Sequence, residues 1–199
     1  MLFRQMKYFA AVVECSSFTE AAERCYISQS AISQQIRSLE KELGVELILN
    51  DQRRAFSDVY VNFELMQCGC YAELSIQNPL SKKEKIRLEE LRQPPCILIS
   101  SREQQNAEQE YYRNTLGFGG SYLFADNLEE ARLLVVSGRG FLPVESVGTL
   151  PPEGNSIRRL PVYQGDQQIM RNYCMFWKKD QTGYYIEEFA DLLRRLLFA

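Results

Sequence analysis

The chain lacks histidine altogether, which removes several kinds of site from consideration. Without an imidazole there is no Ser-His-Asp or Cys-His catalysis and no histidine-ligated metal centre. Long apolar runs are also missing, and the first residues show no basic stretch followed by a long apolar core. We therefore expect a cytoplasmic protein that has no membrane partner.

The six cysteines form no Cys-x-x-Cys pair, and the Cys68-Gly69-Cys70 spacing is tighter than that of most zinc ligands. Free and mostly buried thiols are the expectation, with no bound metal and no cofactor. The net charge of −3 gives no indication of a nucleic-acid partner, and residues 1–54 hold seven basic and seven acidic side chains. If this segment binds nucleic acid, its basic groups must be concentrated on one face.

Three helices are predicted in the first fifty residues. Apolar residues at helical spacing, including Met6, Phe9 and Val13, predict a helix over residues 3–15. The pattern Ser17-Phe18-Thr19-Glu20 is a capping box that opens a short second helix. The expected inner face of this second helix consists of Phe18, Ala21, Ala22 and Cys25.

The third predicted helix spans residues 29–43, capped by Ser28 and followed by Gly44. Its inward positions are Ile32, Ile36, Leu39 and Leu43, and its opposite stripe is Ser30, Ser33, Gln34, Arg37 and Lys41. Short hydroxyls, an amide and an arginine suit a surface that enters a DNA groove. A merely solvated polar face is the alternative.

Residues 9–14 (FAAVVE), 17–24 (SFTEAAER), 28–40 (SQSAISQQIRSLE) and 43–47 (LGVEL) resemble the winged helix-turn-helix head of LysR-type transcriptional regulators. The resemblance implies a helix-turn-helix at residues 18–37 that binds double-stranded DNA, with 29–43 as the recognition helix. It implies that Ser17 and Thr19 lie near the DNA backbone. It also implies that five residues of this helix face the DNA groove: Gln29, Ser30, Ser33, Gln34 and Arg37.

A two-stranded wing follows the recognition helix in this family. Residues 45–57 could form that hairpin, with Arg53 and Arg54 as phosphate contacts. However, Ile48 and Asn50 stand where the family usually has an aromatic and a basic residue. Residues 47–54 would serve equally well as a strand that enters the second half of the chain.

Strands at residues 70–76, 96–100, 122–125 and 140–144 are separated by helices at 103–115 and after the capping box Asn127–Glu130. This alternation favours a parallel α/β sheet. Residues 95–99, 127–131, 138–143 and 176–179 resemble the second subdomain of a LysR-type effector domain, which has a periplasmic-binding-protein-like fold and holds a small-molecule inducer. The resemblance makes Ser100, Ser101 and Phe141 candidate remnants of an effector-binding pocket.

The family's long linker helix and first effector subdomain are not recognisable after Ser57, which suggests an internal deletion. The expected fold is an α-helical winged helix-turn-helix domain (1–57) followed by an incomplete α/β periplasmic-binding-protein-like domain (58–199). A final helix carries an apolar stripe whose usual partner would be the missing subdomain, so it needs the sheet, the head or a second chain. That stripe is Ile186, Phe189, Ala190, Leu193 and Leu197.

The sequence thus predicts a sequence-specific DNA-binding transcriptional regulator of LysR type, a homo-oligomer that responds weakly or not at all to an inducer. The alternative is a small-molecule-binding α/β domain whose head no longer binds DNA. We expect no enzyme and no catalytic residue. Gly117–Gly120 follows a helix rather than a strand, unlike a dinucleotide fingerprint, and no paired acid/base site is visible.

Overall fold

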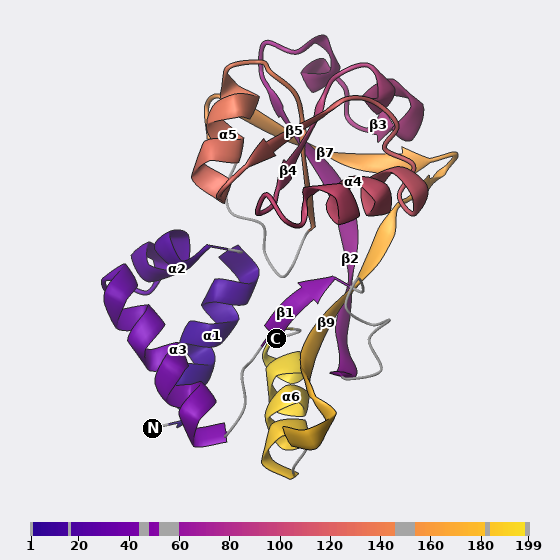
Figure 1. Cartoon of the computed structure of the whole chain (residues 1–199). Coiled ribbons are helices and arrows are strands. Elements are labelled where there is room, and N and C mark those ends of the chain that lie inside the picture. Colours follow the sequence, from indigo (N-terminus) through magenta and orange to yellow (C-terminus); the bar gives the residue numbers. More distant parts are fainter. Residues whose placement is uncertain are drawn as a thin grey trace. The chain divides into compact units, whose positions relative to one another are not determined.

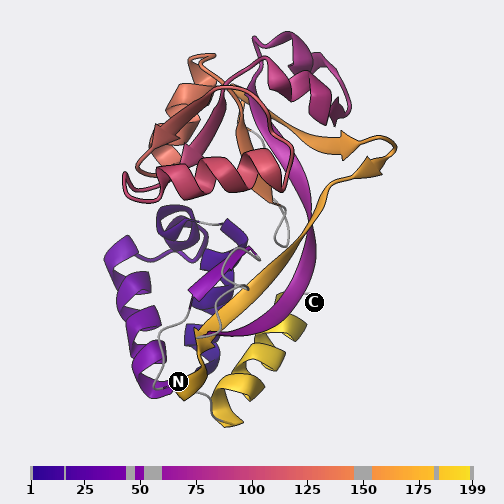
Figure 2. The same ribbon diagram turned by 45° about the vertical axis from the view of Figure 1, so that its right-hand side comes forward.

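The computed structural model describes residues 2–15, 17–43, 48–51, 60–145, 154–181 and 184–197. It divides into two compact units (Figures 1 and 2). The first unit contains residues 1–68, 146–151 and 171–199, and the second contains 69–145 and 152–170. Each unit is described by itself. No helix in the described part of the chain is both long enough and apolar enough to cross a membrane.

Three helices open the first unit: α1 (Leu2–Cys15), α2 (Phe18–Arg24) and α3 (Gln29–Leu43). Their bounds confirm the predicted helices to within a residue or two. The expected inward residues Met6, Phe9 and Val13 are buried, as are most of those predicted for α2 and α3. Phe18 is an exception because its side chain is 39% exposed, so its assignment to the inner face was wrong.

Two small residues allow the three helices to pack closely. Ala21 and Ala22 are fully or almost fully buried, and α2 contacts both α1 and α3. A side chain without atoms beyond Cβ lets a neighbouring backbone approach to short distance. The core cluster of this unit includes these alanines together with Ile32, Ile36 and Leu39 of α3.

The rest of the first unit consists of strands and a final helix. The strands are β1 (Ile48–Asp51), the first part of β2 (Tyr60–Ser75) and nearly all of β9 (Met170–Lys178). A short 3-10 helix (Lys179–Gln181) and α6 (Tyr184–Leu197) complete it. β9 lies between β1 and β2, and β1 is antiparallel to β9 with Ile48 opposite Phe176.

The apolar stripe of α6 is buried in the same core as the head helices. Ile186, Phe189, Ala190, Leu193 and Leu197 are all buried and belong to one cluster with Phe9 and Trp177. The rings of Phe9 and Phe189 lie 5.8 Å apart, so α6 packs on α1. Of the three partners considered for this helix, the head and the strands of its own unit provide the contacts.

The second unit is built around a mixed sheet. β2 is antiparallel to both β6 (Leu142–Glu145) and β7 (Ile157–Gln164), whereas β3 (Ile86–Arg87) is parallel to β7. β4 (Cys96–Ile99) and β5 (Tyr122–Ala125) are parallel to each other, and Cys96 forms a parallel bridge to Phe141. The predicted parallel pairing is confirmed for β4, β5 and the bridge at Phe141, but it was wrong for residues 70–76, because β2 is antiparallel to both β6 and β7. A short strand β8 (Gln167–Gln168) pairs with β7.

Helices α4 (Gln105–Asn114) and α5 (Leu128–Val136) cover opposite faces of β4. Alternate residues of a strand point to opposite faces, and here Cys96 and Leu98 pack in the cluster with Tyr112 of α4. Ile97 packs instead with Ala131 and Val135 of α5. Short 3-10 helices at Pro79–Lys82 and Leu88–Arg92 complete this unit. The α/β alternation predicted for this part of the chain is confirmed.

A buried ionic cluster joins two strands and one helix of the second unit. Glu73 of β2 is only 1% exposed and accepts hydrogen bonds from Arg132 of α5 at 3.0 and 3.1 Å. It also accepts hydrogen bonds from Arg159 of β7 at 2.5 and 3.1 Å. A carboxylate buried this deeply is retained only when it is paired and hydrogen-bonded.

All six cysteines are free, and five are buried, as the sequence predicts. Burial raises the pKa of the Cys68 thiol to about 12 and that of Cys174 to about 11. Within the described residues, no group of three acidic or cysteine side chains comes together as a metal site would require.

Candidate nucleic-acid interface

The short helix α2 is fixed at its start by a capping serine. Ser17 has extended backbone geometry, and its Oγ accepts a hydrogen bond from the amide of Glu20 at 3.3 Å. This contact satisfies one of the amides that the first turn of a helix leaves without an intrahelical partner. Ser17 is half-buried and Thr19 is exposed, so Thr19 is accessible at the surface beside the cap.

The turn between α2 and α3 is tight and contains a feature that the sequence did not reveal. Tyr26 has a φ of 56°, a left-handed conformation that costs a non-glycine residue roughly 1–2 kcal/mol. The Ile27 amide donates to the Ala22 carbonyl at 3.0 Å and closes the turn. The Tyr26 side chain is 94% exposed, so an aromatic ring stands in solvent directly before α3. In the sequence, the only signal for this feature is a bulky tyrosine at a turn position, where glycine or asparagine is more usual.

The N-terminus of α3 is capped by Ser28, whose Oγ accepts a hydrogen bond from the Ala31 amide at 3.1 Å. The same hydroxyl lies 3.0 Å from the hydroxyl of Ser30. Gln29 and Ser30 are exposed in this first turn, where the helix dipole and the free amides favour negative charge.

A polar stripe runs along the exposed side of α3, opposite the buried Ile32, Ile36 and Leu39. Its members are Ser30, Ser33, Gln34, Arg37 and Lys41; all are exposed except Ser33, which is half-buried. The only charged members, Arg37 and Lys41, are both basic. Neither forms a hydrogen bond or ion pair within the described part of the chain, so both remain available to a ligand.

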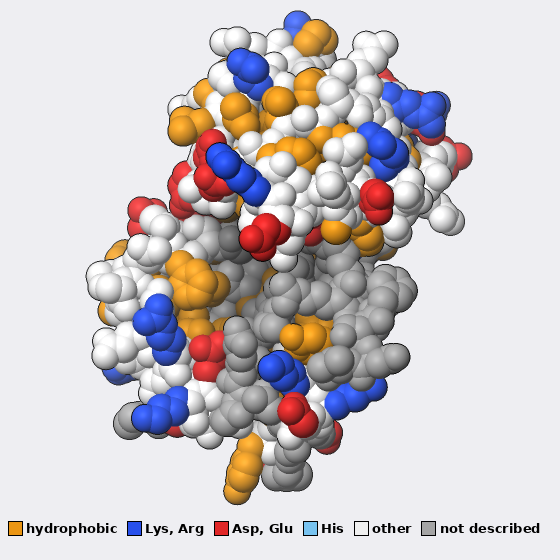
Figure 3. Space-filling view, in the orientation of Figure 1, with side chains coloured by type: hydrophobic (Ala, Val, Ile, Leu, Met, Phe, Trp, Pro, Cys, Tyr) orange, Lys and Arg blue, Asp and Glu red, His pale blue; other side chains and the backbone are white. Residues whose placement is uncertain are grey.

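Basic side chains are visible over the head helices in the space-filling view, on the left of Figure 3 below its middle. Within the polar stripe of α3 the two charged residues, Arg37 and Lys41, are both basic, as a DNA-binding face requires in a segment whose overall charge is balanced. Nucleic-acid affinity derives mainly from phosphate neutralisation, and a stripe with two basic residues and no acidic one provides that on one face.

The two remaining predicted phosphate contacts, Arg53 and Arg54, lie outside the described residues. Their proposed hairpin would begin with the strand at Ile48–Asp51. In the structure this strand is antiparallel to β9, which carries Phe176 and Trp177 of the segment that resembles the second effector subdomain. The wing itself remains a prediction.

Of the candidate effector-binding residues, Ser100 and Ser101 directly follow β4, whereas Phe141 lies opposite Cys96 at the beginning of that strand. Ser100 is buried, and its hydroxyl donates to the Ser101 carbonyl at 3.1 Å, whereas Ser101 is exposed. Phe141 is fully buried, with its ring 5.6 Å from that of Phe118. Phe141 therefore has no surface to offer a ligand in this conformation.

Comparison with known proteins identifies the family of the helical head. Residues 3–57 match the model described as "Bacterial regulatory helix-turn-helix protein, lysR family". The head is a LysR-type helix-turn-helix domain. It is 47% identical over 53 residues to the transcriptional regulator BenM of Acinetobacter baylyi, a match that covers 27% of this chain and 17% of BenM. It is 44% identical over 54 residues to the Hca operon transcriptional activator HcaR of Escherichia coli, covering 27% of this chain and 18% of HcaR.

The fold of the whole chain is that of LysR-type regulators. The crystal structure of full-length BenM aligns with a TM-score of 0.59 at 15% identity, over 98% of this chain and 96% of that one. HinK, a LysR family regulator from Pseudomonas aeruginosa, aligns with a TM-score of 0.55 at 16% identity, over 99% and 98% of the two chains. These likenesses show the fold: a helical head followed by an α/β part, as in full-length regulators of this type. The sequence matches to the curated relatives, by contrast, span less than a fifth of those proteins.

Proposed function

We propose that this chain is a sequence-specific DNA-binding transcriptional regulator of LysR type, with α3 as its recognition helix. The observation that carries the proposal is the exposed polar stripe of α3 on a head that matches the LysR-type model. Gln34 and Arg37 have the reach and the donor groups to contact base edges or phosphates, and the short Ser30 and Ser33 allow α3 to seat deeply.

The proposed interface extends beyond α3 on both sides. Ser17 and Thr19 at the start of α2 are the proposed contacts to the DNA backbone, and Gln29 is the first residue of the proposed groove-facing surface. Arg53 and Arg54 remain proposed phosphate contacts. We add Tyr26, because an exposed phenol directly before α3 can donate a hydrogen bond to a phosphate oxygen.

We further propose that the protein acts in the cytoplasm without catalysing a reaction, and that any response to an inducer is weak or absent. A ligand site of this kind encloses most of its ligand. Of the three candidate residues, Phe141 is buried in the core and the Ser100 hydroxyl is engaged within its own loop, which leaves Ser101 exposed. A small molecule that changes DNA affinity several-fold in a thermal-shift and binding screen would contradict this part of the proposal.

The test of DNA binding starts from random duplexes, because the operator is not needed in advance. Sequences enriched by the full chain are compared with scrambled versions by fluorescence anisotropy at several salt concentrations. We expect the enriched duplex to bind at least about tenfold more tightly at every salt concentration, since specific sites exceed non-specific ones by far more than this. Equal affinities would show non-specific binding only, and no binding at low salt would favour the alternative of a head that has lost its function.

A further inference from the structure

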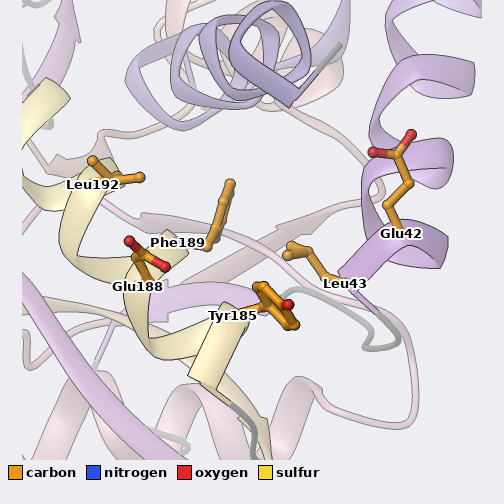
Figure 4. A pocket seen from close by; sticks show the side chains of 6 residues that line it. All are labelled: Glu42, Leu43, Tyr185, Glu188, Phe189 and Leu192. Carbon is orange, nitrogen blue, oxygen red and sulfur yellow. The ribbon is translucent and has the colours of Figure 1, made fainter.

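A hollow of about 380 Å³ opens between the end of α3 and the helix α6, both in the first unit. Figure 4 shows Leu43 projecting from α3 towards Phe189 and Tyr185 of α6. Leu192 continues the apolar lining along α6, and two carboxylates, Glu42 and Glu188, complete it. The hollow is therefore lined by apolar and acidic side chains.

One side of α6 bordering this hollow is exposed and apolar at regular intervals. Tyr185 is 76% exposed and Leu192 is 41% exposed. With Glu188 and Arg195, both also exposed, they follow the spacing 3, 4, 3 that places residues along one seam of a helix. We call these four residues the α6 seam. It is distinct from the buried stripe of α6, which faces the core of its own unit.

The charges of α6 are distributed unevenly along its length. Glu187 and Glu188 lie in its first half, and Arg194 and Arg195 lie in its last turn. Seven residues of helix separate Glu188 from Arg195 by about 10 Å, too far for them to pair with each other. Neither forms a hydrogen bond or ion pair within the described part of the chain.

An antiparallel copy of the same helix complements this pattern. Reversing the direction of α6 brings Glu188 beside the partner's Arg195 and puts the two-fold axis midway between them, so that Leu192 lies next to its own symmetry mate. A two-fold axis repeats each contact, because residue i meets j and j meets i in such an interface. A surface whose acidic and basic ends lie on one helix is thus complementary to itself.

We propose that a second copy of this chain docks on the α6 seam, with the two α6 helices antiparallel beside the hollow at the end of α3. The proposal rests on the proposed function, because regulators that read two-fold operators use two heads held at fixed spacing. α6 packs on α1 through Phe189 and Phe9 within one compact unit, so pairing of α6 carries both heads with it.

The seam is short, which limits the strength of the dimer. Its four residues span about three turns of helix, and such a contact buries much less than the roughly 1,200–2,000 Å² of a stable interface. We therefore expect a monomer–dimer equilibrium with a dissociation constant in the micromolar range or weaker.

The test is sedimentation velocity of the full chain over a wide concentration range without DNA. Glu188→Arg and Arg195→Glu should each weaken dimerisation by about tenfold, because each reversal acts at both symmetry-related contacts and replaces attraction with repulsion. The double variant E188R/R195E restores opposite charges and should return to within about threefold of the parent chain. Thermal melting of every variant shows whether it is folded.

Matched apolar substitutions locate the surface. Leu192→Ser should weaken the dimer, whereas Leu133→Ser, which alters a 70% exposed leucine on α5 of the other unit, should not. A monomer at all concentrations, single reversals without effect, a double variant that stays weak, or loss of the dimer in Leu133→Ser would each overturn the proposal. Binding of the monomeric variants to a half-site duplex is measured separately. A dimer that binds no DNA would refute the proposed function and leave the seam intact.

Discussion

Replacement of Arg37 by alanine tests the recognition-helix assignment most directly. Arg37 is exposed on the polar stripe of α3 and forms no hydrogen bond or ion pair within the described residues. Its truncation should therefore change the free energy of unfolding by less than about 0.5 kcal/mol. An arginine that contacts a base or a phosphate contributes about 1–3 kcal/mol to binding, so DNA affinity should fall by about 5- to 150-fold for each head.

The salt dependence separates the two roles open to Arg37. If its guanidinium contacts a phosphate, the slope of log K against log salt becomes shallower by about 0.9, and all sequences lose affinity alike. If it contacts a base edge, the slope is retained and discrimination at one position is lost. Arg102→Ala removes another exposed arginine, one in the other unit, and is the matched control. A folded Arg37→Ala variant with the affinity of the parent chain would refute the assignment of α3 as the recognition helix.

Three further substitutions or measurements address the packing. Ala22→Leu should destabilise the head by about 1–3 kcal/mol, because it overfills the contact of α2 with α1 and α3; an unchanged urea midpoint would contradict this packing. Glu73→Ala should cost about 3–5 kcal/mol by leaving two arginines without their buried counter-charge, and Glu73→Gln less; equal stability of all three proteins would disprove the role of this cluster. In the native protein at pH 8, a disulfide reagent should modify the half-buried Cys25 first. Cys68 should react only after denaturation, because burial raises the pKa of its thiol to about 12. Rapid reaction of several thiols would contradict their burial.

The helices of the head could be predicted from the sequence because their signals are local. Ser17 and Ser28 cap α2 and α3 as expected, and the apolar period of each helix identifies its buried side. Phe18 was misplaced because it is the first residue of α2, where a side chain can turn away from the core. The exposure of Tyr26 depends on the geometry of the turn, which the periodicity of the flanking helices does not specify.

The sheet was harder to predict because its pairings are remote in sequence. A strand was expected only at residues 70–76, yet β2 begins at Tyr60 and neighbours β9, about a hundred residues later. Apolar periodicity reports which side of a strand is buried and says nothing about its partner or direction. For the same reason the sequence could not decide whether residues 47–54 form a wing or a strand. The pairing of Ile48 with Phe176 answers this question only for Ile48–Asp51.

The surface that covers the apolar stripe of α6 could not be predicted from the sequence either, and it bears on function. The stripe of α6 was evident from its spacing, but a stripe alone specifies only that some apolar surface must cover it. In the structure that surface is the core of the head's own unit, with Phe189 against Phe9. Burial of the stripe removes it as a surface for a second chain and leaves the exposed α6 seam for that purpose. A helix that packs on the head by one side and, as proposed, pairs with a second copy by the other is placed to set the spacing between two heads.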